Sequence, residues 1–315
     1  MFLLDAHVDT ITRLMEKEQE LYDNDGHLSL KHLEGFKSAV IIFAIFLHKE
    51  KNKDIGLFKK FNEVYDFLKK QIKINSSTVS LAKSARHIEQ LAARYKVVAV
   101  PAIEEGAILE GRMDNLYKAD EMGIRYITLT WNFPNEIGEP SKLNGGGLTL
   151  FGKDVLREMN KLGVFADVSH LSEAGFWDVY KLSDKPFIAS HSNAKALCNH
   201  HRNLTDDQLR AIGEKNGCVG VNFCNAFLTE WETSDKPSGA NIDDVCRQVD
   251  HMLKMAGEDC VGIGSDFDGI TETPVGLENA SKLHVLYDTF KVRYGNDLSD
   301  KIFYHNFMRV LNNNI

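Results

Sequence analysis

Cysteine is scarce in this chain of 315 residues, which contains five of them. Their number is odd, and no two are spaced as a C-x-x-C pair. This pattern argues against a disulfide framework and against a thiolate zinc site. Free thiols in a reducing compartment are the simpler interpretation.

A surplus of basic residues is also missing. Lys and Arg together number 37 and Asp and Glu 45, which gives a net charge of −8 at pH 7. No basic tract stands out, so nucleic acid is not an expected partner.

Long hydrophobic runs are absent as well. The best run, from Ala39 to Leu47, falls far short of the ~20 residues that cross a bilayer. The N-terminus reaches Asp5 without a positively charged segment, so it does not read as a signal peptide. We therefore expect no anchor, no membrane span and a cytoplasmic location.

Short apolar runs recur along the whole chain and are typical of strands buried on both faces. Eight segments have this character: Phe2–Val8, Ala39–Phe46, Lys96–Ile103, Arg125–Trp131, Gly163–Val168, Pro186–Ser190, Cys218–Phe223 and Val261–Ser265.

Helical periodicity fills the stretches between these runs. Apolar residues follow a 3.6-residue period from Leu148 to a stop at Gly163, and again from an N-cap at Asn241 to Gly257. The segment from Phe58 to Ile74 predicts an amphipathic helix with a solvated lysine face. In contrast, the glycine-rich stretch from Asn132 to Gly147 predicts an irregular loop above one barrel mouth.

Eight strands alternating with helices favour an α/β fold, a (β/α)8 TIM-type barrel, over the alternative of an open doubly wound sheet. Only 6 prolines occur, and no linker, repeat or low-complexity tract divides the chain. We predict a single barrel domain over residues 1–315, with C-terminal helices from Leu277 onward packed outside it.

Titratable residues stand at the ends of five of these strands. Barrel enzymes place their chemistry at the carboxyl ends of strands. The segments concerned are His7-Val8-Asp9, Glu104-Glu105, Asp167-Val168-Ser169-His170, Ser190-His191-Ser192 and Ser265-Asp266-Phe267-Asp268. Five such groups at corresponding points of a repeating pattern predict a shared site.

Imidazole and carboxylate together suit zinc or a similar divalent ion. His7 and Asp9 are two residues apart, so on an extended chain both side chains point to the same face. Either Glu104 or Glu105 could bridge two metals, and spacing does not decide between them. The serines beside His191 read as ordinary loop residues, because no G-x-S-x-G motif occurs.

These motifs resemble a known family. The segments that carry the resemblance, in order, are LLDAHVDT, AIEEGAI, DVSH, ASHSNA, HHRNLTDDQL and GIGSDFDG, from about residue 3 to the C-terminus. Together they resemble the membrane dipeptidase (renal dipeptidase) family, peptidase family M19. The resemblance implies an amidohydrolase-like metal-dependent barrel with two zinc ions per chain. It also implies hydrolysis of dipeptides, including those with a D residue at the C-terminal position.

The resemblance assigns a role to each ligand position. His7 and Asp9 match ligands of one zinc, and His170 and His191 match ligands of the other. Glu104 matches the bridging glutamate, whereas the next position, here Glu105, is usually Gly in the family.

Further positions match the substrate and proton-transfer machinery. Arg202 resembles the arginine that holds the substrate carboxylate, and Asp266 the aspartate near the metal-bound water. Asp268 looks structural. Trp131 stands where characterised mammalian members carry a histidine that polarises the scissile carbonyl. We interpret Trp131 as an apolar wall of the substrate pocket, the rival being an indole N–H that donates to the oxyanion.

The resulting hypothesis is a zinc dipeptidase in which a metal-bound hydroxide attacks the peptide bond of a free dipeptide. The small dipeptide is the expected partner, and a homodimer is common in the family. Two alternatives remain. One is another binuclear-zinc amide hydrolase, such as an N-acyl amino acid deacylase. The other is a metal-stabilised barrel that acts as a binding or scaffold protein.

Overall fold

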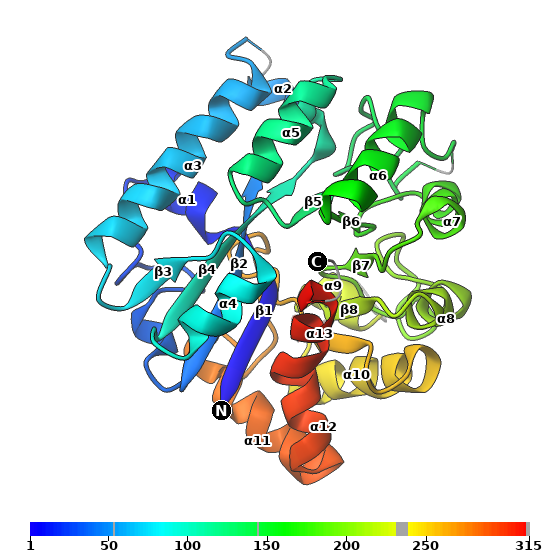
Figure 1. Ribbon diagram of the computed structural model, residues 1–315. Coiled ribbons are helices and arrows are strands. Elements are labelled where there is room, and N and C mark those ends of the chain that lie inside the picture. The colour runs from blue at the N-terminus through cyan, green and yellow to red at the C-terminus, as the bar shows by residue number, and fades with distance from the viewer. Residues whose placement is uncertain (53, 144, 231–238, 313–315) are drawn as a thin grey trace.

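The computed structural model describes residues 1–52, 54–143, 145–230 and 239–312. Within them, parallel strands run in the order β2-β1-β9-β8-β7-β6-β5-β4, and β4 pairs back onto β2. This last pairing closes a barrel of eight parallel strands, so the TIM-type prediction is confirmed and the open sheet is excluded (Figure 1).

All eight predicted strands are present, most of them shorter than the apolar runs. They are β1 (Phe2–Val8), β2 (Ser38–Phe46), β4 (Val97–Glu104), β5 (Tyr126–Thr128), β6 (Phe165–Asp167), β7 (Ile188–Ala189), β8 (Cys218–Val221) and β9 (Val261–Ile263). A further strand, β3 (Val79–Leu81), was not predicted. It pairs with the first residues of β4. The last residues of β4 pair with β5 along the same edge, and β2 pairs along the other edge.

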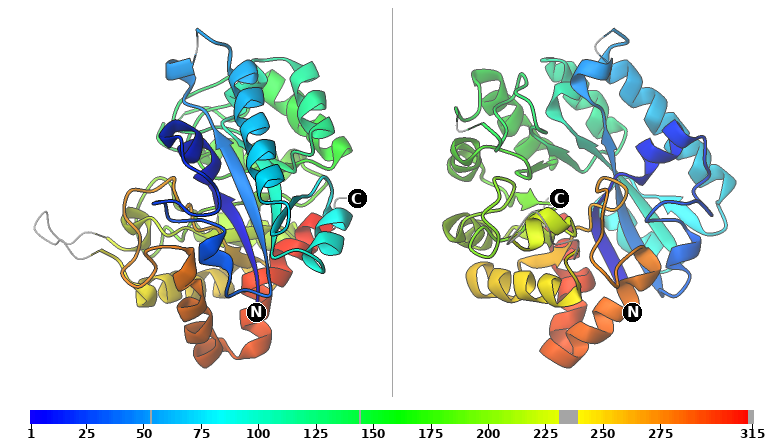
Figure 2. Two further views of the ribbon diagram at one scale, coloured as in Figure 1. Left: turned by 90° about the vertical axis from the view of Figure 1, so that its left-hand side faces the viewer. Right: turned by 180° about the vertical axis from the view of Figure 1, so that it is seen from behind.

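Helices surround the strands, as the two views of Figure 2 show. They are α1 (Thr10–Lys17), α2 (Lys49–Asn52), α3 (Leu57–Ile74), α4 (Ala85–Ala92), α5 (Met113–Glu121), α6 (Leu150–Leu162), α7 (Glu173–Leu182), α8 (Asp206–Glu214), α9 (Asn225–Leu228), α10 (Ile242–Ala256), α11 (Leu283–Tyr294), α12 (Asn296–Asp300) and α13 (Asn306–Asn312). Short 3₁₀ turns cover Lys31–Leu33, Gly106–Leu109 and Ala280–Lys282, and a π turn covers Lys301–His305.

The helix boundaries follow the signals in the sequence. Gly163 ends α6 in the left-handed conformation, with φ 72°, as a C-terminal glycine does. The Asn241 side chain accepts the backbone N–H groups of Asp243 and Asp244, which caps α10. Helix α3 buries one face, which includes Phe61, Val64 and Leu68. The loop between β5 and α6 has no regular structure in its described residues, as predicted.

The barrel interior and the C-terminal end of the chain share one apolar cluster. Leu4 and Ala6 of β1 belong to it, and so do Phe307 and Leu311 of α13. Phe307 packs against β9 where Gly262 lacks a side chain, because a Cβ there would lie 2.4 Å from the Phe307 ring. In Figure 1, α13 lies beside β1 and β8. The helix therefore covers the barrel end opposite to the strands' carboxyl ends.

A β-bulge interrupts β1 just before the predicted site. Asp5 pairs with Ile41 and Val8 pairs with Phe43, so three steps along β1 match two along β2. Leu4 and Ala6 face the interior, and strict alternation would turn His7 toward the helices. The bulge instead turns His7 toward the barrel mouth, as bulges beside active sites commonly do. Val8 packs on the helix side, so His7 and Asp9 share a face as predicted, and the bulge makes that face the barrel mouth.

Among the described residues, no helix has the length and apolar character needed to span a membrane.

Candidate metal centre

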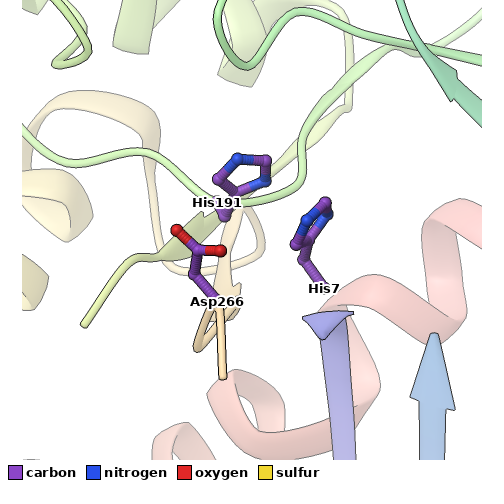
Figure 3. A group of neighbouring side chains, drawn as sticks. All are labelled: His7, His191 and Asp266. Atoms are coloured by element: carbon purple, nitrogen blue, oxygen red, sulfur yellow. The ribbon is translucent and has the colours of Figure 1, made fainter. Parts of the chain in front are cut away.

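Five strands deliver polar side chains to one end of the barrel. Glu104 ends β4, and His7 lies near the end of β1. Asp9, His170, His191 and Asp266 follow β1, β6, β7 and β9. Three groups of these residues lie close enough to hold a cation: His7, Asp9 and Glu104; Glu104, His170 and His191; and His7, His191 and Asp266. Figure 3 shows the last group pointing inward from three separate elements.

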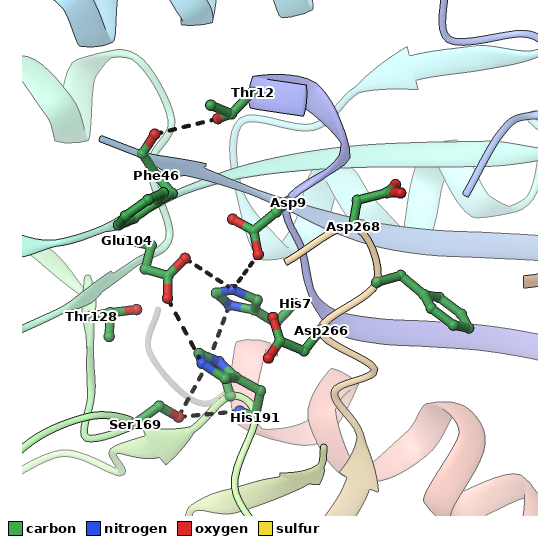
Figure 4. A network of polar contacts seen from close by, with 12 residues as sticks. His7, Asp9, Thr12, Phe46, Glu104, Thr128, Ser169, His191, Asp266 and Asp268 are labelled. Carbon is green, nitrogen blue, oxygen red and sulfur yellow. Dashed lines mark hydrogen bonds and ion pairs between the residues drawn. The ribbon is translucent and has the colours of Figure 1, made fainter. Parts of the chain in front are cut away.

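The Glu104 carboxylate faces two sides at once. Its Oε2 lies 3.3 Å from His7 Nε2, which is itself 3.5 Å from Asp9 Oδ2. Its Oε1 lies 3.3 Å from His170 Nε2 and 3.8 Å from His191 Nε2. Figure 4 shows His7 between Asp9 and Glu104. Glu104 thus joins two half-sites, each with its own ligands.

The imidazoles turn their Nε2 atoms toward the centre. Each Nδ1 has a protein partner: Tyr126 Oη at 2.8 Å for His7, Asn132 Oδ1 at 3.0 Å for His170 and Ser190 Oγ at 2.7 Å for His191. His170 Nε2 and His191 Nε2 are only 3.0 Å apart. His7 Nε2 is buried and has no hydrogen-bond partner among the described residues.

Neutral imidazoles that carry the proton on Nδ1 present bare lone pairs at Nε2. Converging lone pairs repel one another unless a cation lies between them. The donor set therefore fits bound divalent metal ions.

The charges at the centre lead to the same conclusion. Burial, followed by the charge of Glu104, raises the pKa of Asp9 to about 7. Burial, followed by the charge of Asp9, raises the pKa of Asp266 to about 8. Burial also lowers the pKa values of His170 and His191, which keeps both rings in the neutral form that binds metal. The centre thus holds more negative charge than the protein around it compensates.

Strained backbone clusters at the same end of the barrel. Glu105, His170, Asp266 and Asp268 have φ values of 90°, 67°, 61° and 69°. Residues other than glycine adopt positive φ at a cost, and such positions concentrate at functional sites. Three of the four directly follow or include a predicted site residue.

Asp266 is held in place from two sides. Its Oδ2 accepts a hydrogen bond from Asn222 Nδ2 at 2.9 Å, and its backbone N–H donates to the carbonyl of His7. Gly269 allows this arrangement, because a Cβ there would lie 2.1 Å from Asp9 Oδ2 and 2.4 Å from Asp266 Oδ1. Asp266 Oδ1 therefore remains available at the centre.

The geometry separates Glu104 from Glu105. Glu105 turns away from the histidines and accepts hydrogen bonds from Ala107 N and from Asn135 Nδ2 in the loop that follows Trp131. Burial raises the pKa of its carboxyl. Its contacts tie the loop to the end of β4.

Asp268 also points away from the centre. Its carboxylate accepts the Thr10 hydroxyl at 2.6 Å and the His27 backbone N–H at 2.7 Å. These contacts hold α1 and the following loop, in line with a structural residue.

Arg202 lies beside the second half-site. It is buried, donates from Nη2 to the carbonyl of His191 at 3.3 Å, and stacks near Phe227. Its Nε has no hydrogen-bond partner among the described residues. A cavity of about 350 Å³ opens next to it, lined in part by His170, Lys195 and His201. A buried guanidinium with free donors beside a cavity suits a carboxylate ligand.

Trp131 stands in an aromatic cluster on another side of His170. Its ring centroid lies 4.6 Å from that of Phe46, 5.8 Å from Phe133 and 6.2 Å from His170. His48 packs against both Trp131 and Phe133. The centre thus has an apolar boundary close to its second half-site.

Sequence reasoning assigned no role to the residues beneath the ligands. Tyr126, Asp167 and Ser190 are fully buried and contact the ligands or one another. The interpretation of Ser190 as an ordinary loop residue is wrong. Asn222, which holds Asp266, carried no motif at all. Their positions at or next to strand ends were the only available signal.

Known proteins share this arrangement. A model of the membrane dipeptidase family (peptidase family M19) matches residues 1–314. A metallopeptidase from Rhodobacter sphaeroides, solved with a phosphinate mimic of the dipeptide L-Ala-D-Ala, is 27% identical with a TM-score of 0.89; the match covers 100% of this chain and 99% of that one. The dipeptidase AC structure, from the same family, is 27% identical with a TM-score of 0.88, over 100% and 98% of the two chains.

A curated relative adds sequence support. A Klebsiella pneumoniae protein, described as uncharacterized and encoded in the pqqA 5' region, is 37% identical over 254 residues, which is 78% of this chain and 93% of that protein. The fold and the ligand cluster define a metal-dependent hydrolase built on a TIM-type barrel. The chain belongs to the membrane dipeptidase family, and it is a metallo-dipeptidase.

Proposed function

We propose that this chain uses two zinc ions to hydrolyse free dipeptides, with L-D dipeptides among its substrates. The observation that carries the proposal is the two-sided Glu104 carboxylate, each oxygen of which lies 3.3 Å from a different histidine. Mixed imidazole and carboxylate ligands suit zinc. The L-Ala-D-Ala mimic bound by the Rhodobacter sphaeroides relative supports a D residue at the C-terminal position.

The ligand roles follow from the half-sites. His7, Asp9 and Glu104 Oε2 would hold one ion, and His170, His191 and Glu104 Oε1 the other. When bound, the metal supplies an acidified water for attack and polarises the carbonyl oxygen of the peptide bond.

Asp266 is the proposed proton carrier. Asn222 occupies its Oδ2, which leaves Oδ1 to take the proton of the attacking water and pass it to the leaving amine. Burial raises the pKa of this carboxyl group, which favours its holding the proton between the two transfers.

Arg202 and Trp131 would bind the substrate. Arg202 would clamp the free carboxylate of the dipeptide, which limits the substrate to two residues. Trp131, within its aromatic cluster, would form an apolar wall for a substrate side chain.

The direct test combines metal analysis with a substrate panel. Purified protein should hold close to two zinc equivalents, lose activity with a chelator and regain it with zinc. The panel pairs L-L and L-D dipeptides with their N-acetylated and C-amidated forms. Hydrolysis of N-acetylated dipeptides as fast as free ones would favour the deacylase, and no turnover by zinc-loaded protein would favour a scaffold.

The carboxylate clamp has its own test. Charge-assisted hydrogen bonds contribute about 1.5–3 kcal/mol each, so Arg202→Met should lower kcat/KM for free dipeptides by roughly 10- to 100-fold or more. Dipeptide amides should be poor substrates of the wild type, and the variant should discriminate less against them. Equal cleavage of amides and free acids by the wild type would exclude the clamp.

A further inference from the structure

A single serine hydroxyl lies beneath both half-sites. Ser190 is fully buried, and its Oγ is 2.7 Å from His191 Nδ1 and 3.3 Å from His7 Nδ1. His7 and His191 belong to different half-sites of the centre. Ser190 thus contacts both from the side opposite to Glu104, whose place above the two rings is visible in Figure 4.

Asp167 determines where the Ser190 proton points. Asp167 Oδ2 accepts from Ser190 Oγ at 2.7 Å and from Thr128 Oγ1 at 2.6 Å. Asp167 Oδ1 accepts the backbone N–H groups of Ser169 and Ser190. A carboxylate only accepts, so both hydroxyl protons are committed to it.

The direction of the Ser190 hydroxyl proton determines which nitrogen of His191 carries a proton. Because Ser190 Oγ has given its only proton to Asp167, it offers just lone pairs to the rings. His191 must then donate from Nδ1, which leaves the lone pair on Nε2, the atom that faces Glu104.

The two histidines depend on Ser190 unequally. Tyr126 donates its hydroxyl proton to the carbonyl of Ala6 at 2.9 Å and accepts from His7 Nδ1 at 2.8 Å. His7 therefore has a second acceptor for its Nδ1 proton. For His191 Nδ1, Ser190 is the sole hydrogen-bond partner in the described part of the chain.

We propose that Ser190, oriented by Asp167, is a positioning residue that holds His191 in its metal-binding tautomer and thereby sets the metal affinity of the second half-site. The proposal rests on the assignment of His170 and His191 to one metal ion under the proposed function. It concerns metal binding alone, so it can be tested without any peptide substrate.

The experiment compares Ser190→Ala with two matched controls. Thr128→Val removes the other hydroxyl donor to the same Asp167 oxygen, and among the described residues this hydroxyl forms no hydrogen bond with a histidine. Ser192→Ala removes a neighbouring buried hydroxyl whose only side-chain hydrogen bond in the described part of the chain is to Ser169 Oγ, at 3.4 Å. Each full-length variant is stripped of metal. Stepwise zinc affinities are then measured by competition with a chromophoric chelator, and Co²⁺ absorption reports the ligand geometry.

The expected result is selective. Loss of a group that orients a metal ligand typically weakens metal binding by about 10–100-fold. Ser190→Ala should lose this much affinity at one of the two equivalents, the one bound by His170 and His191, and change the other only a few-fold. Both controls should keep both affinities, even where their metal-free melting temperatures fall as far as that of Ser190→Ala.

Asp167→Asn gives a second, independent measurement. Its amide can donate to Ser190 Oγ, which frees the hydroxyl proton to point at His191 Nδ1 and favours the wrong tautomer. Zinc affinity at the half-site of His170 and His191 should fall as in Ser190→Ala, although the shape of the side chain is kept. Wild-type affinities in Ser190→Ala, or equal losses in Thr128→Val, would overturn the proposal. A wild type that binds two metals but cleaves no dipeptide would instead contradict the proposed function.

Discussion

Asp266 combines burial with a free oxygen at the centre of the site. Among the described residues, Asn222 alone holds the carboxyl group, through Oδ2, and burial raises the pKa of the group. Asp266→Asn keeps the shape and the Asn222 contact but removes the basicity. We expect kcat to fall by roughly 10²–10⁴-fold, the usual contribution of general acid–base catalysis. Steady-state kinetics with parallel metal analysis checks this.

The metal content separates two interpretations of that variant. If Asp266 carries protons, the Asn variant retains its zinc and loses turnover. If Asp266 is mainly a ligand in the group with His7 and His191, zinc is lost together with activity. Near-normal kcat would assign the proton transfer to another residue.

Trp131 differs from Asp266 because it cannot titrate near neutral pH. An indole has one N–H donor and no proton to transfer. The packing of Trp131 against Phe46 and Phe133 supports an apolar wall. Trp131→Ala should raise KM for apolar dipeptides more than it lowers kcat, and Trp131→Phe should be tolerated.

The rival role of Trp131 predicts a different pattern. Removal of an oxyanion donor typically costs ~10²–10³ in kcat. A loss of that size in Trp131→Phe, with KM unchanged, would identify the indole N–H as the donor. Kinetics of both variants on one apolar and one charged dipeptide distinguish the two roles.

At the scale of elements, hydrophobic patterning identified the barrel strands because each is apolar on both faces. β3 escaped this reasoning because it has only three residues, with Ser80 at its centre. The bulge in β1 escaped it too, since a bulge is defined by the register with a partner strand. Patterns within one segment do not contain that register.

For the site, too, features within one segment were predictable and contacts between distant segments were not. The ligands were predictable because parallel strands of a barrel bring their carboxyl ends to one rim. The residues beneath them were not, since their contacts join distant parts of the chain: Ser190 and His7 are 183 positions apart. Asn132, Asn222 and Tyr126 likewise gain their roles only from tertiary proximity.

The last helix contributes to stability rather than to chemistry. Phe307 on α13 is buried against β9 at the barrel end remote from the metal centre. Phe307→Ala should destabilise the protein by about 3–5 kcal/mol, the usual cost of such a truncation. Zinc content and kcat at low temperature should stay unchanged.

Val292→Ala on α11 is the matched control, because Val292 is 91% exposed and surface changes usually stay within about 0.5 kcal/mol. Equal effects of the two substitutions on denaturant unfolding would contradict this view of α13.

At the scale of the whole molecule, the excess negative charge of the metal centre should make the free energy of unfolding depend on pH. In the metal-free protein the pKa of Asp266 is about 8, against an ordinary value of 3.8. Between pH 7 and 9 the unfolded chain has already lost this proton, whereas the folded chain still releases it. Folding is therefore favoured less as the pH rises through this range. Burial and the charge of Glu104 raise the pKa of Asp9 to about 7, and the pKa of His7 is raised as well, so both groups act in the same direction as Asp266. His170 and His191 have lowered pKa values and stay neutral in this range.

Melting of chelator-treated protein at constant ionic strength measures this dependence. A group with this pKa accounts for a loss of about 1 kcal/mol between pH 7 and 9, or roughly 2–4 °C in melting temperature. Metal-free Asp266→Asn should show a smaller decline, because its amide does not titrate, and Asp9 and His7 account for the decline that remains. Zinc-loaded protein should lack it as well, since a bound cation favours the ionised carboxylate and metal binding releases protons. Parallel declines in metal-free wild type and Asp266→Asn would show that another group titrates in this range, and that Asp266 is already ionised at neutral pH.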